Sequence, residues 1–139
     1  MSARLAVTLF RGWKSVDSPR DEYPYRFIGE AAEDYGVLDV AIGEYVRGKI
    51  PNPTYDMLID LARRGGREGF ERLVETHSGD LKFGRFGSAT FQSDTFKYIQ
   101  FWFISNGLDF IIVEYHKWEA PSNRVLAELQ QIVASMSIA

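Results

Sequence analysis

Two apolar runs stand out in the last third of the chain, at residues 96–104 and 108–117, with Ser-Asn-Gly between them. Asn-Gly is typical of a two-residue type I′ turn, because both turn residues need a positive φ. The pattern therefore predicts an antiparallel hairpin. A two-residue turn places Phe101 opposite Ile112 and fixes the pairing of every other position.

Both faces of this predicted hairpin are largely apolar or aromatic. Phe101 and Ile112 share one face, and Tyr98, Trp102 and Tyr115 share the other, where they can stack on a ligand or pack beneath a helix. A sheet covered on one face only would alternate apolar and polar residues. The predicted fold class is therefore α+β: a central antiparallel sheet with helices on both faces, a three-layer sandwich closed by a C-terminal helix.

Shorter apolar patterns predict further strands around the hairpin. Residues 37–46 alternate, so that Leu38 and Val40 lie on one face and Asp39 on the other. The other expected strands are 5–10, 25–28 and 81–91, and the expected loop and turn are 14–24 and 30–36. No linker or repeat divides the sequence, so we expect residues 1–139 to form a single α+β domain.

Three helices are predicted from capping residues and apolar spacing. Asn52 as N-cap and Pro53 at the first position begin the first helix, and the Gly-Gly pair after Arg64 ends it. A second, shorter helix up to residue 79 is predicted from the spacing of Phe70, Leu73, Val74 and His77. The third covers about residues 122–136, with an apolar stripe of Val125, Leu129, Ile132, Val133 and Met136.

Composition and charge narrow the classes of function. The chain has 139 residues, no cysteine and a formal net charge of −3. Disulfides, thiolate metal sites and cysteine nucleophiles are excluded, and no broad basic surface is expected for nucleic acid. No stretch reaches the roughly 20 apolar residues that cross a bilayer, and no signal peptide is recognised. We expect a cytoplasmic protein that binds neither nucleic acid nor membrane and needs no cofactor.

The acidic segment 30–44, with the tyrosine-rich loop 23–35, is the first candidate binding site, because the stretch 30–60 holds seven acidic and two basic residues. Such a segment can face a basic protein partner, and a solvated loop and strand edge is the alternative. The expected partner is a protein, and the chain is expected to be a monomer or homodimer. The expected contact residues combine acidic residues with nearby tyrosines: Tyr23, Tyr25, Glu30, Glu33, Asp34, Tyr35, Asp39 and Glu44.

Lys97, Glu114 and His116 form the second candidate site. The two-residue turn places them on one face, at the end of the hairpin remote from the turn. A carboxylate beside an apolar floor can have its pKa raised, and a nearby histidine can transfer protons. This predicts a small-molecule-binding or hydrolytic domain, whereas a Lys97–Glu114 cross-strand ion pair is the alternative. The two histidines of the chain lack the spacing of metal ligands, so no metal is expected.

Three segments carry a resemblance to a known fold: Gly84–Phe91, Trp102–Gly107 and Ile132–Ile138. With the order of the elements, they resemble the Mog1/PsbP-like fold, a central antiparallel sheet sandwiched by helices. Its known members are mostly binding or assembly proteins: a GTPase-binding factor, a photosystem accessory subunit and chaperone-like subunits of bacterial secretion systems. The resemblance implies a non-enzymatic protein-binding module and carries over no site residue. A small, cysteine-free chain without a catalytic motif also fits an immunity-type, antitoxin-like or assembly accessory protein.

Overall fold

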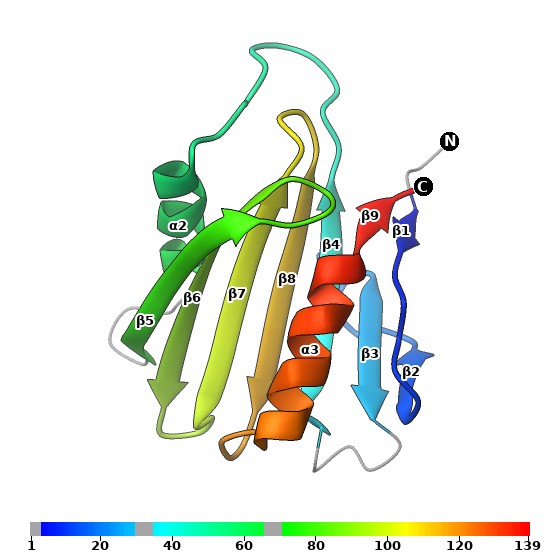
Figure 1. Cartoon of the computed structure of the whole chain (residues 1–139), viewed down its shortest axis with the longest axis vertical. Helices are drawn as coiled ribbons and strands as arrows, with labels where there is room; N and C mark the ends of the chain where they lie inside the picture. The colour runs from blue at the N-terminus through cyan, green and yellow to red at the C-terminus, as the bar shows by residue number, and fades with distance from the viewer. Residues whose placement is uncertain (1–3, 30–34, 66–70) are drawn as a thin grey trace.

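The computed structural model of the protein describes residues 4–29, 35–65 and 71–139. Its helices are α2 (Tyr55–Arg64) and α3 (Asn123–Ser135), and its strands are β1 (Leu5–Ala6), β2 (Trp13–Val16), β3 (Tyr25–Gly29), β4 (Val37–Gly43), β5 (Glu71–Asp80), β6 (Arg85–Ser93), β7 (Tyr98–Ser105), β8 (Phe110–Lys117) and β9 (Ser137–Ile138). Seven of these strands form one antiparallel sheet in the order β2-β3-β4-β8-β7-β6-β5, and β1 pairs with β9 (Figure 1).

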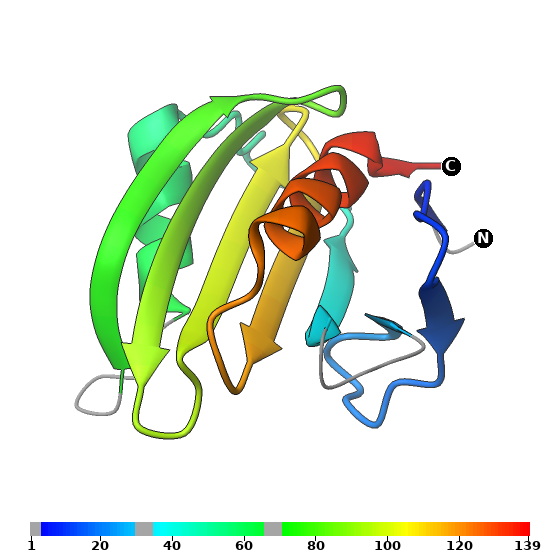
Figure 2. The same cartoon turned by 60° about the horizontal axis from the view of Figure 1, so that its bottom comes forward.

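The two helices lie on opposite faces of the large sheet (Figure 2). α3 covers a core that includes Trp102 of β7, Val113 of β8 and Val40 of β4. α2 packs on a smaller core that includes Ala89 of β6 and Phe101 of β7. Successive residues of a strand point to opposite faces, so Phe101 and Trp102 belong to different cores. The expected three-layer α+β architecture is confirmed.

The C-terminal helix forms where its sequence predicts it. Ser122 is the N-cap, and its hydroxyl accepts a hydrogen bond from the Val125 N–H at 3.2 Å. The predicted stripe is buried: Val125, Leu129, Ile132, Val133 and Met136. Of the helices in the described part of the chain, none has the length and apolar character to cross a bilayer.

α2 begins later than the sequence pattern indicates. Thr54, not Asn52, is the N-cap, and its hydroxyl accepts a hydrogen bond from the Met57 N–H at 3.2 Å. Asn52 has a φ of 34° and donates its backbone N–H to the carbonyl of Gly107 at 2.9 Å. The prediction of an Asn52 cap was wrong because the β7–β8 turn engages this backbone group, and the helix ends before Gly65 as predicted.

Residues 71–80 form strand β5, so the prediction of a second helix was wrong. β5 is an edge strand that pairs with β6, with a bulge between Leu73 and Glu75. A bulge adds one residue to a strand, and here it gives the apolar positions a spacing that also suits a helix. Phe70, where that spacing starts, lies outside the described residues.

The β7–β8 hairpin is present, but its turn contains four residues between the paired ends rather than two. Phe101 pairs with Glu114 instead of Ile112, so the predicted register was wrong by two residues. The side chain of Asn106 stabilises the longer turn, because its Oδ1 accepts hydrogen bonds from the N–H groups of the residues two and three positions later, at 3.0 and 2.9 Å. A shift by two keeps each residue on its predicted face.

The remaining predicted strands are present at about the expected positions, but several differ from the prediction in length. β3 and β4 begin where expected, β4 stops at Gly43, and β6 begins four residues late. The predicted strand at 5–10 is reduced to β1, whose partner β9 comes from the other end of the chain. Residues 13–16 form β2, where most of the segment was predicted as loop. Its two central residues are polar and exposed, so the segment carries little apolar signal.

Gly87 of β6 lets α2 lie directly on the sheet. A Cβ at this position would lie 2.2 Å from the backbone nitrogen of Ile59 and 2.4 Å from the carbonyl carbon of Leu58. Both atoms belong to the backbone of α2, so no rotamer change relieves the clash. Any larger residue here must displace the helix.

We predict that Gly87→Ala lowers the free energy of unfolding by roughly 1–3 kcal/mol, the usual range for overpacking. Gly43→Ala in β4 is the matched control, because its Cβ would meet only the Cβ of Phe110 at 3.6 Å. Urea unfolding followed by circular dichroism measures both changes. Equal stability of the two variants would contradict the close approach of α2.

Candidate functional site

Four charged side chains gather on the face of the sheet that carries α2, beyond the strands that α2 covers. This charged cluster consists of Arg20 in the β2–β3 loop, Arg26 of β3, Asp39 of β4 and Glu114 of β8. Cross-strand pairing brings the three strand residues together. Arg26 pairs with Asp39, and Asp39 pairs with Glu114.

Asp39 is the centre of the charged cluster, and its side chain is 0% exposed. Arg26 donates two hydrogen bonds to its carboxylate, from Nε to Oδ1 at 2.7 Å and from Nη2 to Oδ2 at 2.9 Å. Arg20 Nη1 lies 3.1 Å from the same Oδ2 and also donates to Oε2 of Glu114. Two guanidinium groups therefore balance two carboxylates, as a buried charge requires.

The pKa values of both arginines rise in this arrangement. Burial lowers the pKa of Arg20, but the hydrogen bond and the charge of Glu114, together with Asp39, outweigh it and raise the pKa overall. Hydrogen bonds to Asp39 raise the pKa of Arg26. A carboxylate bound by a permanently charged guanidinium is a poor acceptor for a substrate proton. The geometry suits fastening the β2–β3 loop to the sheet better than it suits proton transfer.

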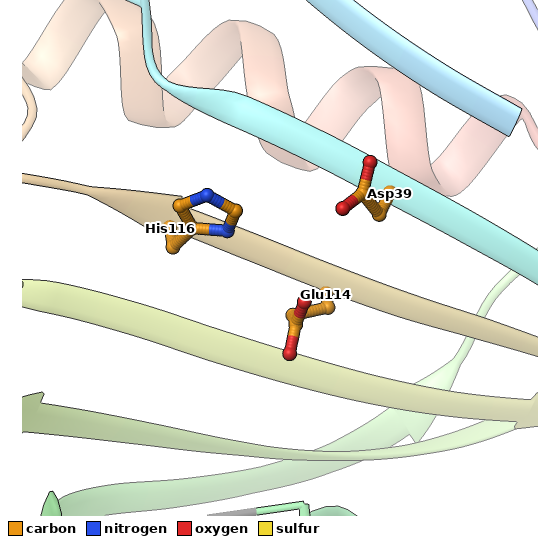
Figure 3. Close-up of side chains that lie close together, drawn as sticks. All are labelled: Asp39, Glu114 and His116. Atoms are coloured by element: carbon orange, nitrogen blue, oxygen red, sulfur yellow. The ribbon is translucent and has the colours of Figure 1, made fainter. Parts of the chain in front are cut away.

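His116 lies on the same side of the sheet as Asp39 and Glu114, as Figure 3 shows. Each of these three residues offers a potential metal-ligand atom, and those atoms lie within 4.8 Å of one another. Arg20 and Arg26 already bind both carboxylates, however, and they bring two positive charges to the place where a cation would lie. The residues present therefore do not fit a divalent metal ion.

The imidazole of His116 is packed against apolar surface. Its ring meets that of Phe96 edge-on, with 4.8 Å between the ring centroids. Burial lowers the pKa of His116, and the negative charge of Glu114 opposes this effect only in part. The ring is therefore neutral at neutral pH.

Lys97 is not part of the charged cluster. It is exposed and precedes β7 by one residue. Arg20, not Lys97, binds Glu114, so the ion pair considered as the alternative does not form. The structure thus brings Glu114 and His116 together, as predicted, and leaves Lys97 apart from them.

The residues of the acidic candidate site are divided between surface and interior. Asp39 is buried in the charged cluster and so does not face a partner. Tyr23 is half-buried beneath the guanidinium of Arg20, whose central carbon lies 4.4 Å from the ring centroid. The hydroxyl of Tyr25 accepts a hydrogen bond from the Leu5 N–H at 3.2 Å. These three residues have structural contacts that account for their positions.

Tyr35 also has structural contacts. Its ring meets that of Trp13 edge-on at 5.3 Å, and its carbonyl accepts a hydrogen bond from the Tyr115 hydroxyl at 2.6 Å. Glu44 is exposed just after β4. The remaining three predicted contacts lie outside the described residues: Glu30, Glu33 and Asp34.

Sequence reasoning missed the two arginines of the charged cluster. Arg26 had a signal, because antiparallel pairing of the neighbouring strands at 25–28 and 37–46 can place it opposite Asp39. Arg20 had none, because it lies in a loop and reaches Glu114 across 94 residues of sequence.

Several solved structures resemble this chain, including the following two. The solution structure of cyanobacterial PsbP (CyanoP) from Synechocystis has a TM-score of 0.56 and 13% identity over 100% of this chain and 95% of that chain. A crystal structure from Bacteroides thetaiotaomicron has a TM-score of 0.52 and 9% identity over 97% of this chain and 45% of that one. No protein-family model and no curated protein matches the sequence. The chain therefore has a PsbP-like fold, as the sequence resemblance predicts, and at these identities the likeness concerns the fold alone.

We predict that Asp39→Asn destabilises the protein by roughly 3–5 kcal/mol, the usual loss when one partner of a buried ion pair is removed. Arg26 would keep its charge and lose its counter-charge, and Arg20 would keep only Glu114 as a partner. The control is Asp60→Asn in the exposed pair with Arg64, where we expect a loss of about 0–1 kcal/mol. Equilibrium denaturation measures both. A loss from Asp39→Asn no larger than that of the control would show that the charged cluster does not stabilise the fold.

The pKa of His116 predicts how stability depends on pH. It is lower in the folded protein than in the unfolded chain, where it is about 6.5. Between these two values the unfolded chain binds more protons, so stability rises with pH and is complete above about 6.5. Urea midpoints measured between about pH 5 and about pH 8 should show this dependence flattened by His116→Gln and kept by His77→Gln. The same slope in both variants would mean that His116 is not its source.

Proposed function

We propose that this chain is a non-enzymatic accessory protein that binds a protein partner through loops at one end of its sheet. The observation that carries the proposal is a set of apolar side chains exposed there: Val46 at 82%, Ile50 at 56% and Leu108 at 42%. They lie in the loop between β4 and α2 and in the β7–β8 turn that this loop arches over (Figure 1). We call residues 44–54 and 106–109 the loop end. Apolar groups gathered on a surface are typical of interaction sites.

Hydrogen bonds hold the loop end in one conformation. The Asn52 N–H donates to the carbonyl of Gly107 at 2.9 Å, and the Tyr45 N–H donates to Oδ1 of Asp109 at 2.7 Å. The Tyr45 hydroxyl donates to the carbonyl of Gly48 at 2.5 Å. A surface that is ordered before binding loses less conformational entropy on association. This order favours a docking surface over a spacer that merely joins two elements.

The charges of the loop end indicate the chemistry of the partner. Arg47 and Lys49 are exposed and alternate with Val46 and Ile50 along the loop, whereas the acidic residues of the loop end lie at its borders, with Glu44 just after β4 and Asp109 bonded to the Tyr45 N–H. A partner with apolar groups flanked by carboxylates would complement this pattern. The sequence pointed to a basic partner through its acidic segment, but the buried Asp39 makes no part of such a surface. We therefore propose an acidic partner surface.

The PsbP-like fold supports an accessory or assembly role, since the sequence resemblance associates this fold with such proteins. Immunity-type and antitoxin-like proteins are further examples of the proposed class, because they too act by binding. The proposal includes a cytoplasmic setting, and the absence of cysteine, which suits a reducing compartment, supports it. A monomer or homodimer is the proposed state.

A hydrolytic or small-molecule-binding function of Lys97, Glu114 and His116 has less support. Arg20 binds the carboxylate of Glu114, and Lys97 lies apart. A general base must be free to take a proton from the substrate. The geometry therefore favours binding through the loop end over catalysis at the charged cluster.

We predict that the double variant Val46→Glu/Ile50→Glu loses its protein partner. The substitutions remove apolar contact area and place negative charge where an acidic partner would dock. Tagged protein incubated with native extract, followed by quantitative mass spectrometry, should show at least tenfold less retained partner. Substitution of such exposed side chains should change the unfolding free energy by no more than about 0.5 kcal/mol.

Met57→Glu is the matched control, because Met57 is an exposed apolar residue of α2 outside the loop end. It should retain the partner at the wild-type level. Undiminished retention by the double variant, or equal loss in the control, would contradict the proposal. Binding to phosphatidylserine vesicles that the double variant abolishes, with no protein retained, would show a membrane surface in place of a protein partner.

A further inference from the structure

The two helices leave part of each face of the sheet uncovered. On the face of α3, the uncovered part lies over β5 and β6, because α3 crosses the sheet nearer β8 and β4 (Figure 1). A pocket of about 350 Å³ lies there, between α3 and the strands β5, β6 and β7. Its lining comprises His77, Ser78, Leu81, Phe86, Ser88, Gln100, Trp102, Gln130 and Val133. The volume lies within the range of small-molecule sites.

The floor of this pocket contains polar residues that are almost fully buried. Ser88 is 1% exposed and Gln100 is 6% exposed, and both line the pocket. Thr90, 4% exposed, lies beside them, because it pairs with Gln100 across β6 and β7. Sheet positions this deep are normally apolar or fully hydrogen-bonded.

The hydrogen-bonding capacity of these polar groups is only partly used among the described residues. The Tyr98 hydroxyl donates its proton to Oε1 of Gln100 at 2.7 Å, so towards the neighbouring hydroxyl of Thr90 it can act only as an acceptor. In the part of the chain that the structure describes, Oγ1 of Thr90 has no hydrogen-bond partner. Ser88 and Gln100 line the pocket, where their polar atoms can bond to a molecule that enters it. An unpaired buried polar atom such as Oγ1 of Thr90 lowers stability, and its presence beside the pocket suits a polar ligand.

The rest of the lining indicates the class of ligand. Trp102 and Phe86 supply aromatic surface, and Gln130 and His77 supply further polar groups at the exposed rim. The described lining contains no lysine, arginine, aspartate or glutamate. A ligand with hydroxyl or amide groups would satisfy the floor, and its apolar side would meet the aromatic rings. A charged ligand would find no opposite charge in this lining.

We propose that this pocket binds a small neutral molecule of monosaccharide size that carries hydroxyl or acetamido groups. Ser88 and Gln100 provide the polar floor, and Trp102 provides the apolar contact. The site is separate from the loop end, since no residue substituted in the test of partner binding lines it. Either proposal can therefore fail while the other stands.

The test uses ¹H–¹⁵N NMR titration with two probes, methyl β-glucopyranoside and N-acetylglucosamine. At least one probe should shift the side-chain amide signal of Gln100 and the indole signal of Trp102 in a saturable manner. Ser88→Ala and Gln100→Met should weaken the dissociation constant at least tenfold. Gln92→Met is the matched control, because Gln92 is an exposed residue of β6 outside the pocket, and it should bind the probe like the wild type.

Thermal unfolding separates a ligand site from a structural one. Ser88→Ala should leave the unfolding midpoint unchanged or raise it, because the proposal assigns this hydroxyl to the ligand and not to a bond within the protein. A lowered midpoint would show that the hydroxyl stabilises the fold, and it would overturn the proposal. Two further results would overturn it as well: no saturable shift with either probe, or equal affinity of Gln100→Met and the wild type.

Discussion

Strands β7 and β8 lie at the middle of the sheet and bury residues on both faces, and this burial requires a helix above and below them. One helix is too narrow for a whole face, since its diameter of about 10 Å spans only about two strands spaced about 4.8 Å apart. The sheet has seven strands. α2 and α3 lie on opposite faces and are displaced towards opposite edges of the sheet, so each leaves part of its own face uncovered.

The two uncovered parts of the sheet differ in whether their polar side chains have partners. On the half beside α2, the buried carboxylate of Asp39 meets Arg26 at 2.7 Å, and the β2–β3 loop brings Arg20 onto it. The charged groups of this cluster are therefore paired with one another. On the half beside α3, Ser88 and Gln100 line a pocket, and Oγ1 of the neighbouring Thr90 has no hydrogen-bond partner among the described residues. As far as the structure describes these two surfaces, the one beside α3 offers polar groups to an outside molecule.

The sequence predicts elements well where local signals agree with long-range packing. α3 has a capping serine and a regular stripe, and both survive in the fold. The hairpin keeps its two apolar faces because a register error of two residues preserves the pattern. β5 was predicted wrongly because its bulge at Leu73 and Glu75 imitates helical spacing, and only pairing with β6 distinguishes the two. The start of α2 was misplaced because a distant turn binds Asn52.

The candidate site was harder to predict, because a sequence shows how many charged residues a segment contains but not which of them are exposed in the fold. Asp39 adds to the acidic character of its segment, yet two arginines neutralise it inside the protein. Arg20 comes to Glu114 through loop geometry that no local pattern encodes. Because these charges pair with one another, other exposed residues of the described chain are better candidates for binding. They include Arg47 and Lys49, which lie beside the exposed Val46 and Ile50. Glu114, which the sequence suggested as a catalytic residue, instead binds Arg20 and so attaches the β2–β3 loop to the sheet.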